Sequence, residues 1–287
     1  MRFRAASTDL PVLLQAAPRG PDTSAADLIR AVADLGWRLP VLASIPVLWV
    51  AVAHAAAGDA RPGVVVVALK WAPLIASGFA FNLAVSVAAM AIGTIAGMFL
   101  GFGALSHYAP VRGAAWATTQ FFRNSPWLVL LFFAMFLLPF ELRIGPYLIP
   151  LPAWLKAIFG LSLPVMANVA EIVRGGVQSI PVGQWESAES LAFSRRQTLW
   201  QIVLPQAVKR MLPPWMNLYA ILTMATTLIS VVGIQDAMTL TRAALVAEGR
   251  PDLFLPFYFM LLLMFFAYCY PIARFTAHLE RRFAVKG

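Results

Sequence analysis

Long runs without a charged residue alternate with short polar segments along most of the chain. A helix of ~20 apolar residues crosses the ~30 Å of bilayer hydrocarbon, and a charge at mid-membrane costs at least ~3 kcal/mol. The runs are apolar throughout, whereas a barrel strand would alternate at every second residue. The pattern therefore predicts an all-α membrane protein. Six spans are expected, at residues 39–58, within 71–106, and at 124–140, 157–170, 211–235 and 253–273.

A charged segment interrupts this pattern at residues 183–205, which read GQWESAESLAFSRRQTLWQIVLP. Apolar residues recur at helical three- and four-residue steps in both of its halves. Ser194 and Gln197 have the spacing of a capping box, which starts a helix. We predict two short helices joined by a corner near residues 192–194, with Pro205 ending the second helix or opening the next element. The periodic apolar positions are Trp185, Ala188, Leu191, Ala192, Leu199, Ile202 and Val203.

The charged segment has three interpretations. It could be an amphipathic hairpin on the lipid surface, a solvated loop, or a docking elbow that inserts into a partner protein and transmits its motion to the spans. A helix on the lipid surface prefers Lys and Arg along its polar face. Glu186 and Glu189 have no basic residue between them, which favours a protein partner.

Composition strengthens the membrane interpretation. Hydrophobic residues make up 60% of the 287 residues and charged residues only 12%, where a soluble domain carries roughly 25% charged residues. The mean hydropathy is +0.75. The single cysteine, Cys269, excludes a disulfide within the chain, and we interpret it as a small apolar packing residue.

The formal net charge of +9 follows from membrane topology rather than from a nucleic-acid site. Of the 22 Lys and Arg residues, 16 lie on the side of the six predicted spans that holds both termini, and six lie on the other side. Basic loops stay in the cytoplasm, so both termini and the segment at 183–205 are expected there. Basic residues interleaved with exposed aromatics, which a nucleic-acid surface would need, are not seen.

Three glycines mark a helix-packing face in the second predicted span. Gly93, Gly97 and Gly101 repeat at four-residue spacing and therefore line one side of a helix. Small residues on one face let another helix approach closely. That second helix could belong to this chain or to another.

Several polar residues fall inside the predicted spans. Hydrogen bonding within or between helices is their ordinary role, and lining a substrate path is the alternative. Asn217, Thr223 and Thr227 could share one helix face, which favours the path for some of them. Glu171 and Arg174 are three residues apart and are expected to pair on one helix face. The candidate path residues are Asn82, Asn217, Thr223, Thr226 and Thr227.

Motifs of catalysis and metal binding are missing from the sequence. His54, His107 and His278 are scattered, without the spacing of metal ligands. The sequence has no phosphate-binding GxxxxGK, no HExxH and no GxSxG. We therefore expect no metal site, no cofactor and no enzymatic activity in this chain. Energy for an active process would have to come from a partner.

The charged segment resembles the cytoplasmic signature loop of ABC importer permeases. That signature reads Glu-Ala-Ala, three residues, Gly, nine residues, Ile, one residue and Leu-Pro. Ser187 replaces the first alanine of the signature and Ala192 replaces its glycine. A corner that needs positive φ would cost alanine ~1 kcal/mol or more. The matching positions are Glu186, Ser187, Ala188, Ala192, Ile202, Leu204 and Pro205.

The resemblance extends over roughly residues 76–284 and is closest to permeases of the polar amino-acid uptake class. QFFRNSPWLVLLFF, ANVAEIVRGGVQSIPVGQWESA, LPQAVKRMLPPWMN and LERRF are similar to segments of that family. The resemblance implies a type I (MetI-like) importer permease fold, with five core helices from Phe79 onward and one extra N-terminal helix. Residues 1–72 would be a cytoplasmic tail with the extra span. Residues 73–287 would be the permease domain, with a cytoplasmic coupling loop at 174–210.

The same resemblance implies partners and a location. The family works in the bacterial inner membrane as a permease dimer, formed with a second copy or a paralogue. ATPase subunits, which hold ATP and magnesium, dock on the cytoplasmic loops, and a periplasmic binding protein delivers the solute. The implied docking residues are Trp185, Glu186, Ser187, Ala188, Leu191, Ala192, Ile202, Leu204 and Pro205.

The solute is expected to be an amino acid. Family members usually carry Lys and an acidic or amide residue where this chain has Met224 and Ala225, while Thr226 and Thr227 are retained. This departure leaves a same-fold permease for an opine, a sulfonate or a compatible solute as an alternative. A membrane scaffold or sensor that binds a protein other than an ATPase is the alternative outside transport.

Overall fold

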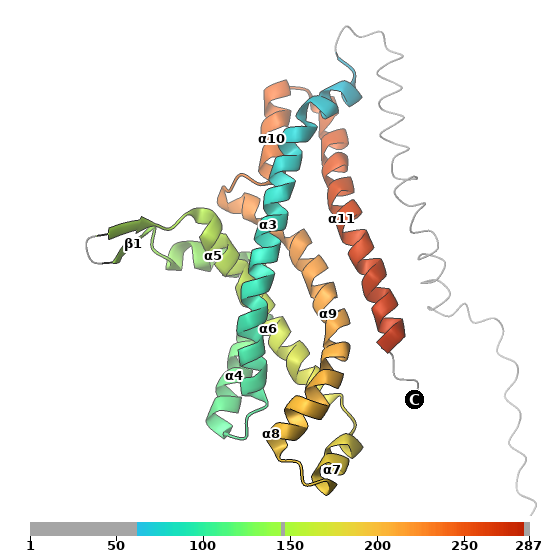
Figure 1. Ribbon diagram of the computed structural model, residues 1–287. Helices are drawn as coiled ribbons and strands as arrows, with labels where there is room; N and C mark the ends of the chain where they lie inside the picture. Colours follow the sequence, from blue (N-terminus) through green and yellow to red (C-terminus); the bar gives the residue numbers. More distant parts are fainter. Residues whose placement is uncertain (1–61, 145–146, 284–287) are drawn as a thin grey trace, which may run out of the picture. The chain divides into compact units, whose positions relative to one another are not determined.

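The computed structural model describes residues 62–144 and 147–283 (Figure 1). These residues fold into helices and one small hairpin, all within one compact unit of the chain. In chain order the α-helices and strands are α3 (Val64–Ala104), α4 (Ala109–Arg123), α5 (Trp127–Leu137), β1 (Glu141–Ile144), β2 (Tyr147–Pro150), α6 (Ala153–Gln178), α7 (Val182–Ser190), α8 (Arg195–Gln197), α9 (Leu204–Ala225), α10 (Ala237–Glu248) and α11 (Phe254–Phe283). A π-helical turn η1 (Thr198–Val203) and the 3-10 turns η2 (Thr226–Val232) and η3 (Pro251–Leu253) complete them.

The pairing of α3 with α6 forms the centre of the fold. A Cβ added at Gly97 would lie 2.6 Å from the Met166 carbonyl oxygen and 2.6 Å from Val169 Cβ. Gly93 and Gly101 meet α6 equally closely. The glycine face predicted from the sequence is therefore confirmed, and its partner is α6 of the same chain.

α6 is also the most enclosed of the span-length helices, since 72% of its most apolar 18-residue window is buried. This helix contains the short predicted span at 157–170. It is less hydrophobic than the other spans because it packs against protein, which does not demand the apolar surface that lipid does. The predicted span is therefore shorter than α6, because it was limited to residues without charge.

The span predicted at 124–140 contains one helix, α5, which is too short to cross a bilayer alone. α4 ends just before this range and meets α5 at an angle of 106°, and Pro126 stands at the N-cap of α5. Proline has no amide hydrogen and favours an extended residue before it, so it starts a helix more readily than it continues one. α5 has only 11 residues, about 16 Å at 1.5 Å per residue.

A hairpin of β1 and β2 follows α5 and was not predicted. It projects from the end of α5 (Figure 1), and its strands pair antiparallel with Leu142 opposite Ile149. Its base is held by the buried Lys156, whose Nζ donates to the Leu138 carbonyl over 3.0 Å and lies 3.8 Å from the centre of the Phe140 ring.

Four helical segments in the described part are long and apolar enough to cross a membrane, or five if the bent pair α4–α5 counts as one. The predicted spans at 71–106, 211–235 and 253–273 all fall on such segments, but the helices extend past them because their polar ends remain helical. The extra span at 39–58 lies outside the described residues. The predicted domain boundary between positions 72 and 73 falls inside the continuous α3.

The predicted loop at 236–252 contains the helix α10. Asp236 caps this helix, because its carboxylate accepts the Thr239 amide over 2.9 Å. Glu248, the last residue of α10, binds α3 by accepting from Lys70 Nζ and from Trp71 Nε1, both over 2.7 Å. α10 is therefore fixed at both of its ends.

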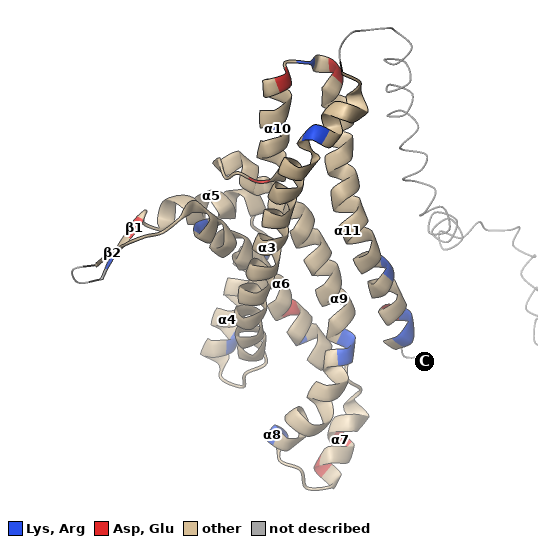
Figure 2. Ribbon diagram, turned by 45° about the horizontal axis from the view of Figure 1, so that its top comes forward, with Lys and Arg blue, Asp and Glu red and all other residues tan. Residues whose placement is uncertain are grey.

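Charged residues divide between the two ends of this unit (Figure 2). Basic residues gather on α8, on α9 and on the C-terminal part of α11, toward the end that carries α7. At the α10 end, basic and acidic residues occur together. The unequal distribution counted along the sequence is thus also an unequal distribution in space.

Candidate functional site

The charged segment folds as a compact knuckle, which we define as residues 182–205. α7 closes it on one side with a tight corner, where the Phe193 amide donates to the Ala188 carbonyl over 3.0 Å and the Ala192 amide donates to the Glu189 carbonyl over 2.9 Å. These two bonds make a Schellman motif. Ala192 has φ of 56°, a left-handed conformation that favours glycine. Alanine therefore carries a backbone strain at this corner.

The second half of the knuckle begins with the predicted capping box. Ser194 Oγ accepts the Gln197 amide over 3.4 Å, and the Ser194 amide donates to Gln197 Oε1 over 2.9 Å. α8 then passes through η1 into α9 without a break. Pro205 lies in the first turn of α9, so it opens the next element and does not stop the helix.

An apolar core attaches the knuckle to the ends of α6 and α9. Ala188 is 1% exposed, and the half-buried Trp185 packs against this core together with Leu199. Gln206 Nε2 donates to Gln184 Oε1 over 3.2 Å, which adds a polar contact between α9 and α7. The knuckle is therefore packed against both helices. The buried core residues are Val177, Ile180, Val203 and Ala207.

The outer surface of the knuckle combines exposed apolar side chains with carboxylates. Leu191 is 71% exposed, and Val182 and Trp200 are also exposed. Glu186 and Glu189 are exposed on α7. Of the predicted docking residues, Glu186, Ser187, Leu191, Ala192 and Pro205 are exposed, Trp185, Ile202 and Leu204 are half-buried, and Ala188 is buried. The single apolar face expected from the periodicity is thus divided between the core and the surface.

A second candidate region is a cavity of about 430 Å³ between the end of α4, α6 and α9. Asn217 is exposed and lines it, together with Arg123, Asn168 and Arg210. Such a volume falls in the range of small-molecule sites, which are ~300–1,000 Å³. The wall has both polar groups and apolar side chains, as a site for a small polar solute requires.

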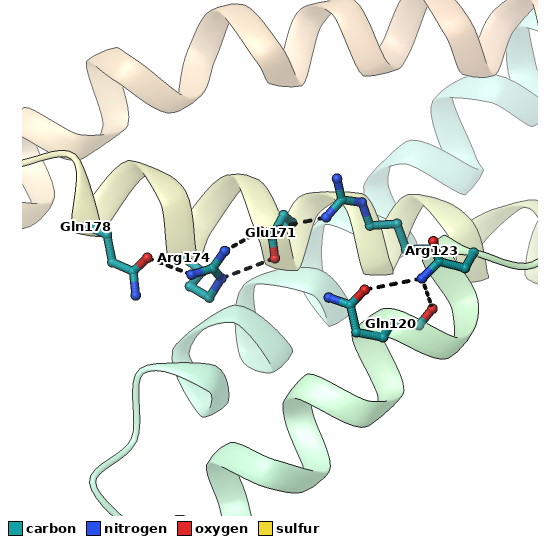
Figure 3. A network of polar contacts seen from close by, with 6 residues as sticks. Gln120, Arg123, Glu171, Arg174 and Gln178 are labelled. Carbon is teal, nitrogen blue, oxygen red and sulfur yellow. Dashed lines mark hydrogen bonds and ion pairs between the residues drawn. The ribbon is translucent and has the colours of Figure 1, made fainter.

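A charged network borders this cavity (Figure 3). Glu171 accepts hydrogen bonds from two nitrogens of Arg174, so the predicted pair on one helix face is confirmed. Arg123 Nη1 approaches the same carboxylate at 3.7 Å, and Arg174 also donates to Gln178 Oε1 over 2.6 Å. One carboxylate therefore joins α4 to α6.

The remaining candidate path residues lie elsewhere and are engaged with protein. Asn82 is buried, and its Nδ2 donates to Thr226 Oγ1 over 3.0 Å and to Asp236 Oδ2 over 3.3 Å. Asn82 Oδ1 accepts the Ala237 amide over 3.0 Å. Asn82 thereby joins α3, η2 and the start of α10. This favours interhelical hydrogen bonding for Asn82 and Thr226.

Two further threonines bond to their own helix. Thr223 Oγ1 donates to the Tyr219 carbonyl over 2.9 Å, and Thr227 Oγ1 donates to the Met224 carbonyl over 2.9 Å. Thr223 is fully buried, whereas Asn217 is exposed. The structure therefore does not bring the five candidate residues together, and only Asn217 among them lines the cavity.

The sequence analysis missed three polar residues, one at the Asn82 junction and two in the wall of the cavity that Asn217 lines. Asp236 lies at the Asn82 junction, and its spacing to Thr239 is a helix-capping signal that could have indicated it. Asn168 and Arg210 line the cavity beside Asn217. Nothing in the local sequence indicates that they line one cavity, because that depends on the packing of α6 against α9.

Comparison with known proteins gives a consistent assignment. Residues 89–285 match the family described as binding-protein-dependent transport system inner membrane component. The probable amino-acid ABC transporter permease protein YckA of Bacillus subtilis is 33% identical over 217 residues, which cover 76% of this chain and 92% of that protein. The inner membrane amino-acid ABC transporter permease protein YhdY of Escherichia coli is 32% identical over 187 residues, which cover 65% of this chain and 50% of that protein.

Solved structures agree with this assignment. A structure titled as an amino acid ABC transporter with histidines superimposes with a TM-score of 0.66 at 25% identity, covering 75% of this chain and 96% of that chain. An inward-facing methionine ABC transporter, MetNI, superimposes with a TM-score of 0.54 at 15% identity, covering 84% of this chain and 99% of that chain. At this identity the likeness to MetNI concerns the fold alone. The predicted importer permease fold is thus confirmed, and in this chain one small hairpin accompanies its helices.

Proposed function

This chain belongs to the family of binding-protein-dependent transport system inner membrane components, and on that premise we propose that it is the permease subunit of an ATP-driven amino-acid importer. The knuckle carries this proposal: it has the signature spacing, an exposed apolar and acidic surface, and a core shared with α6 and α9. The names of the relatives support an amino acid over an opine, a sulfonate or a compatible solute.

In this proposal a separate ATPase subunit docks on the knuckle. ATP binding by that subunit moves the knuckle, and the shared core carries the motion into α6 and α9. The chain forms a dimer with a second copy or a paralogous permease, and a periplasmic binding protein delivers the solute. Both termini and the knuckle lie in the cytoplasm, as the distribution of basic residues favours.

The docking surface is tested with Leu191→Asp. Leu191 is 71% exposed on the outer side of the knuckle, so the substitution should leave folding intact. Burying a new carboxylate in an apolar contact should weaken ATPase binding at least about tenfold, as for an interface hot spot. Affinity is measured with the purified permease and its ATPase. Glu141→Lys on the exposed hairpin is the control, and unchanged ATPase affinity of Leu191→Asp would reject the docking surface.

For the solute path we propose Asn217 as a contact residue, because it lines the cavity beside Arg123, Asn168 and Arg210. Asn217→Leu should lower amino-acid uptake by reconstituted transporter while its thermal stability stays unchanged. Asn82→Leu should instead lower stability, because it leaves Thr226 and the Ala237 amide without their partner. Uptake by Asn217→Leu at the wild-type rate would remove Asn217 from the path.

A further inference from the structure

A cavity beside the knuckle carries only positive charge. It has a volume of about 470 Å³ and lies between the α3–α4 turn, the C-terminal end of α6 and the knuckle. His107, Arg112 and Arg195 line it, and none of the described residues in its wall is acidic. Like charges facing one space repel each other, so this arrangement favours an anion between them.

The two arginines have donors to spare. Arg112 donates through Nη1 to the Ser106 carbonyl over 3.2 Å, and the Arg195 guanidinium has no hydrogen bond or ion pair with any residue in the described part of the chain. A guanidinium offers five N–H donors in a planar fork that fits phosphate oxygens. Arg174, by contrast, is engaged by Glu171 and Gln178.

The rest of the cavity wall is largely apolar. The apolar lining residues are Ala104, Leu105, Val177, Ile180, Val182, Trp185 and Leu199. A free phosphate is far smaller than this cavity, in which a single water molecule would take up only ~30 Å³. It would therefore leave the apolar part of the wall without a contact. The wall therefore suits a phosphate that carries an apolar remainder.

The position along the spans matches such a ligand. α3 ends at Ala104 and α6 ends at Gln178, and residues at both ends line the cavity. Trp116 on the adjacent α4 is 60% exposed, as expected of a tryptophan at a membrane–water interface. Basic pockets at the ends of membrane helices are known forms of lipid headgroup sites.

We propose that this cavity binds the phosphate of an anionic phospholipid from the leaflet on the side of the knuckle. Arg112 and Arg195 bind the phosphate oxygens, and the glycerol and first methylene groups contact Leu105, Ile180 and Trp185. Because Arg112 belongs to α4 and Arg195 to the knuckle, the bound headgroup joins these two parts. The membrane lipid thereby stiffens the attachment of the knuckle.

The test measures lipid selectivity of the full-length protein in nanodiscs, with spin-labelled phosphatidylglycerol compared against spin-labelled phosphatidylcholine. Each arginine near a headgroup is worth about a fivefold change in affinity. Arg112→Gln and Arg195→Gln should each lower the preference for phosphatidylglycerol about fivefold, and the double variant about 25-fold. Arg196→Gln is the matched control, because Arg196 is the exposed neighbour of Arg195 and does not line the cavity.

Three further measurements distinguish this proposal from loss of folding, from binding of free phosphate and from binding of a protein partner. The double Arg→Lys variant keeps the charge and should retain part of the preference, which distinguishes lost binding from lost folding. Inorganic phosphate at millimolar concentration should leave the bound lipid in place, and displacement would overturn the lipid as the source of the phosphate. A double Arg→Gln variant that keeps full lipid selectivity but loses ATPase affinity would assign the cavity to a protein partner and reject the proposal.

Discussion

At Ala192 a side chain occupies a backbone conformation that glycine adopts without strain. A Cβ in the left-handed region costs roughly 1–2 kcal/mol, partly offset by the greater unfolded-state entropy of glycine. We therefore expect Ala192→Gly to stabilise the corner by about 1 kcal/mol and to raise the melting temperature of the purified protein. Ala192→Val should lower that temperature, and a lower value for Ala192→Gly would contradict the strain.

Single residues were predictable where the signal lies within a few positions of the chain. The capping box of Ser194 and Gln197 and the pair Glu171–Arg174 were read from spacing alone and are present. Asn82 was harder, because its partners Asp236 and Ala237 lie over 150 positions away. A polar residue inside a span indicates that a hydrogen-bond partner is needed, but the sequence does not identify that partner.

At the scale of elements, the close contact of α3 with α6 depends on glycines, which have no side chain, at the contact face of α3. A Cβ at Gly97 would lie 2.6 Å from two atoms of α6, so Gly97→Ala must separate the helices. Overpacking of this kind costs typically about 1–3 kcal/mol. No described atom lies within 4 Å of a Cβ added at Gly113 on α4, which makes Gly113→Ala the control. Thermal unfolding in detergent should show a loss only for Gly97→Ala.

The docking of α10 on α3 should depend on pH. The hydrogen bonds from Lys70 and Trp71 hold the pKa of the Glu248 carboxyl below its usual value. These hydrogen bonds therefore stabilise the docking of α10 fully at a pH above the pKa that Glu248 has in the unfolded chain. Their stabilisation is lost as the pH falls through the lower pKa that Glu248 has in the folded protein. The protection of α10 amides, measured as the exchange rate relative to the intrinsic rate at the same pH, should therefore fall at acidic pH. Glu248→Gln should lower this protection at neutral pH and remove its acid dependence; an unchanged dependence in this variant would contradict the prediction.

Elements were predicted best where apolar runs were clean and least well where tertiary packing set the boundary. The glycine face and the helices α3 and α11 follow from local patterns. The bend at residues 124–126 lies at the start of a charge-free run, directly after Arg123, so a search for charge-free stretches did not include the helix α4 before it. The hairpin after α5 is short and has mixed polarity, and its strands are visible only through their pairing.

For the whole molecule, the predicted cytoplasmic position of the knuckle can be tested by thiol labelling. With Cys269 replaced by alanine, Gln197→Cys should react with a membrane-impermeant thiol reagent only in inverted vesicles. Tyr147→Cys on the hairpin should react only in intact cells stripped of their outer membrane. Both positions are exposed, and reaction of both from the same side would contradict the predicted topology.

At this scale the sequence determined the class of protein and its family through composition and one spaced motif. It did not reveal that the predicted path residues separate into a buried junction at Asn82 and a cavity at Asn217. That separation arises because Asn82 on α3 meets η2 and α10, while Asn217 faces α6 two turns before η2. Such an arrangement depends on how the helices cross.

The junction at Asn82 also limits how the protein can change shape. Sliding α3 past η2 or α10 would leave the buried Asn82 side-chain amide and the Ala237 backbone N–H without partners, at about 1–3 kcal/mol for each. We therefore expect these three parts to move together. Pro213 and Pro214 lie within α9 outside this junction, and proline cannot complete the helical hydrogen-bond ladder. If a partner displaces the knuckle, we expect α9 to bend at this proline pair while the junction keeps its shape.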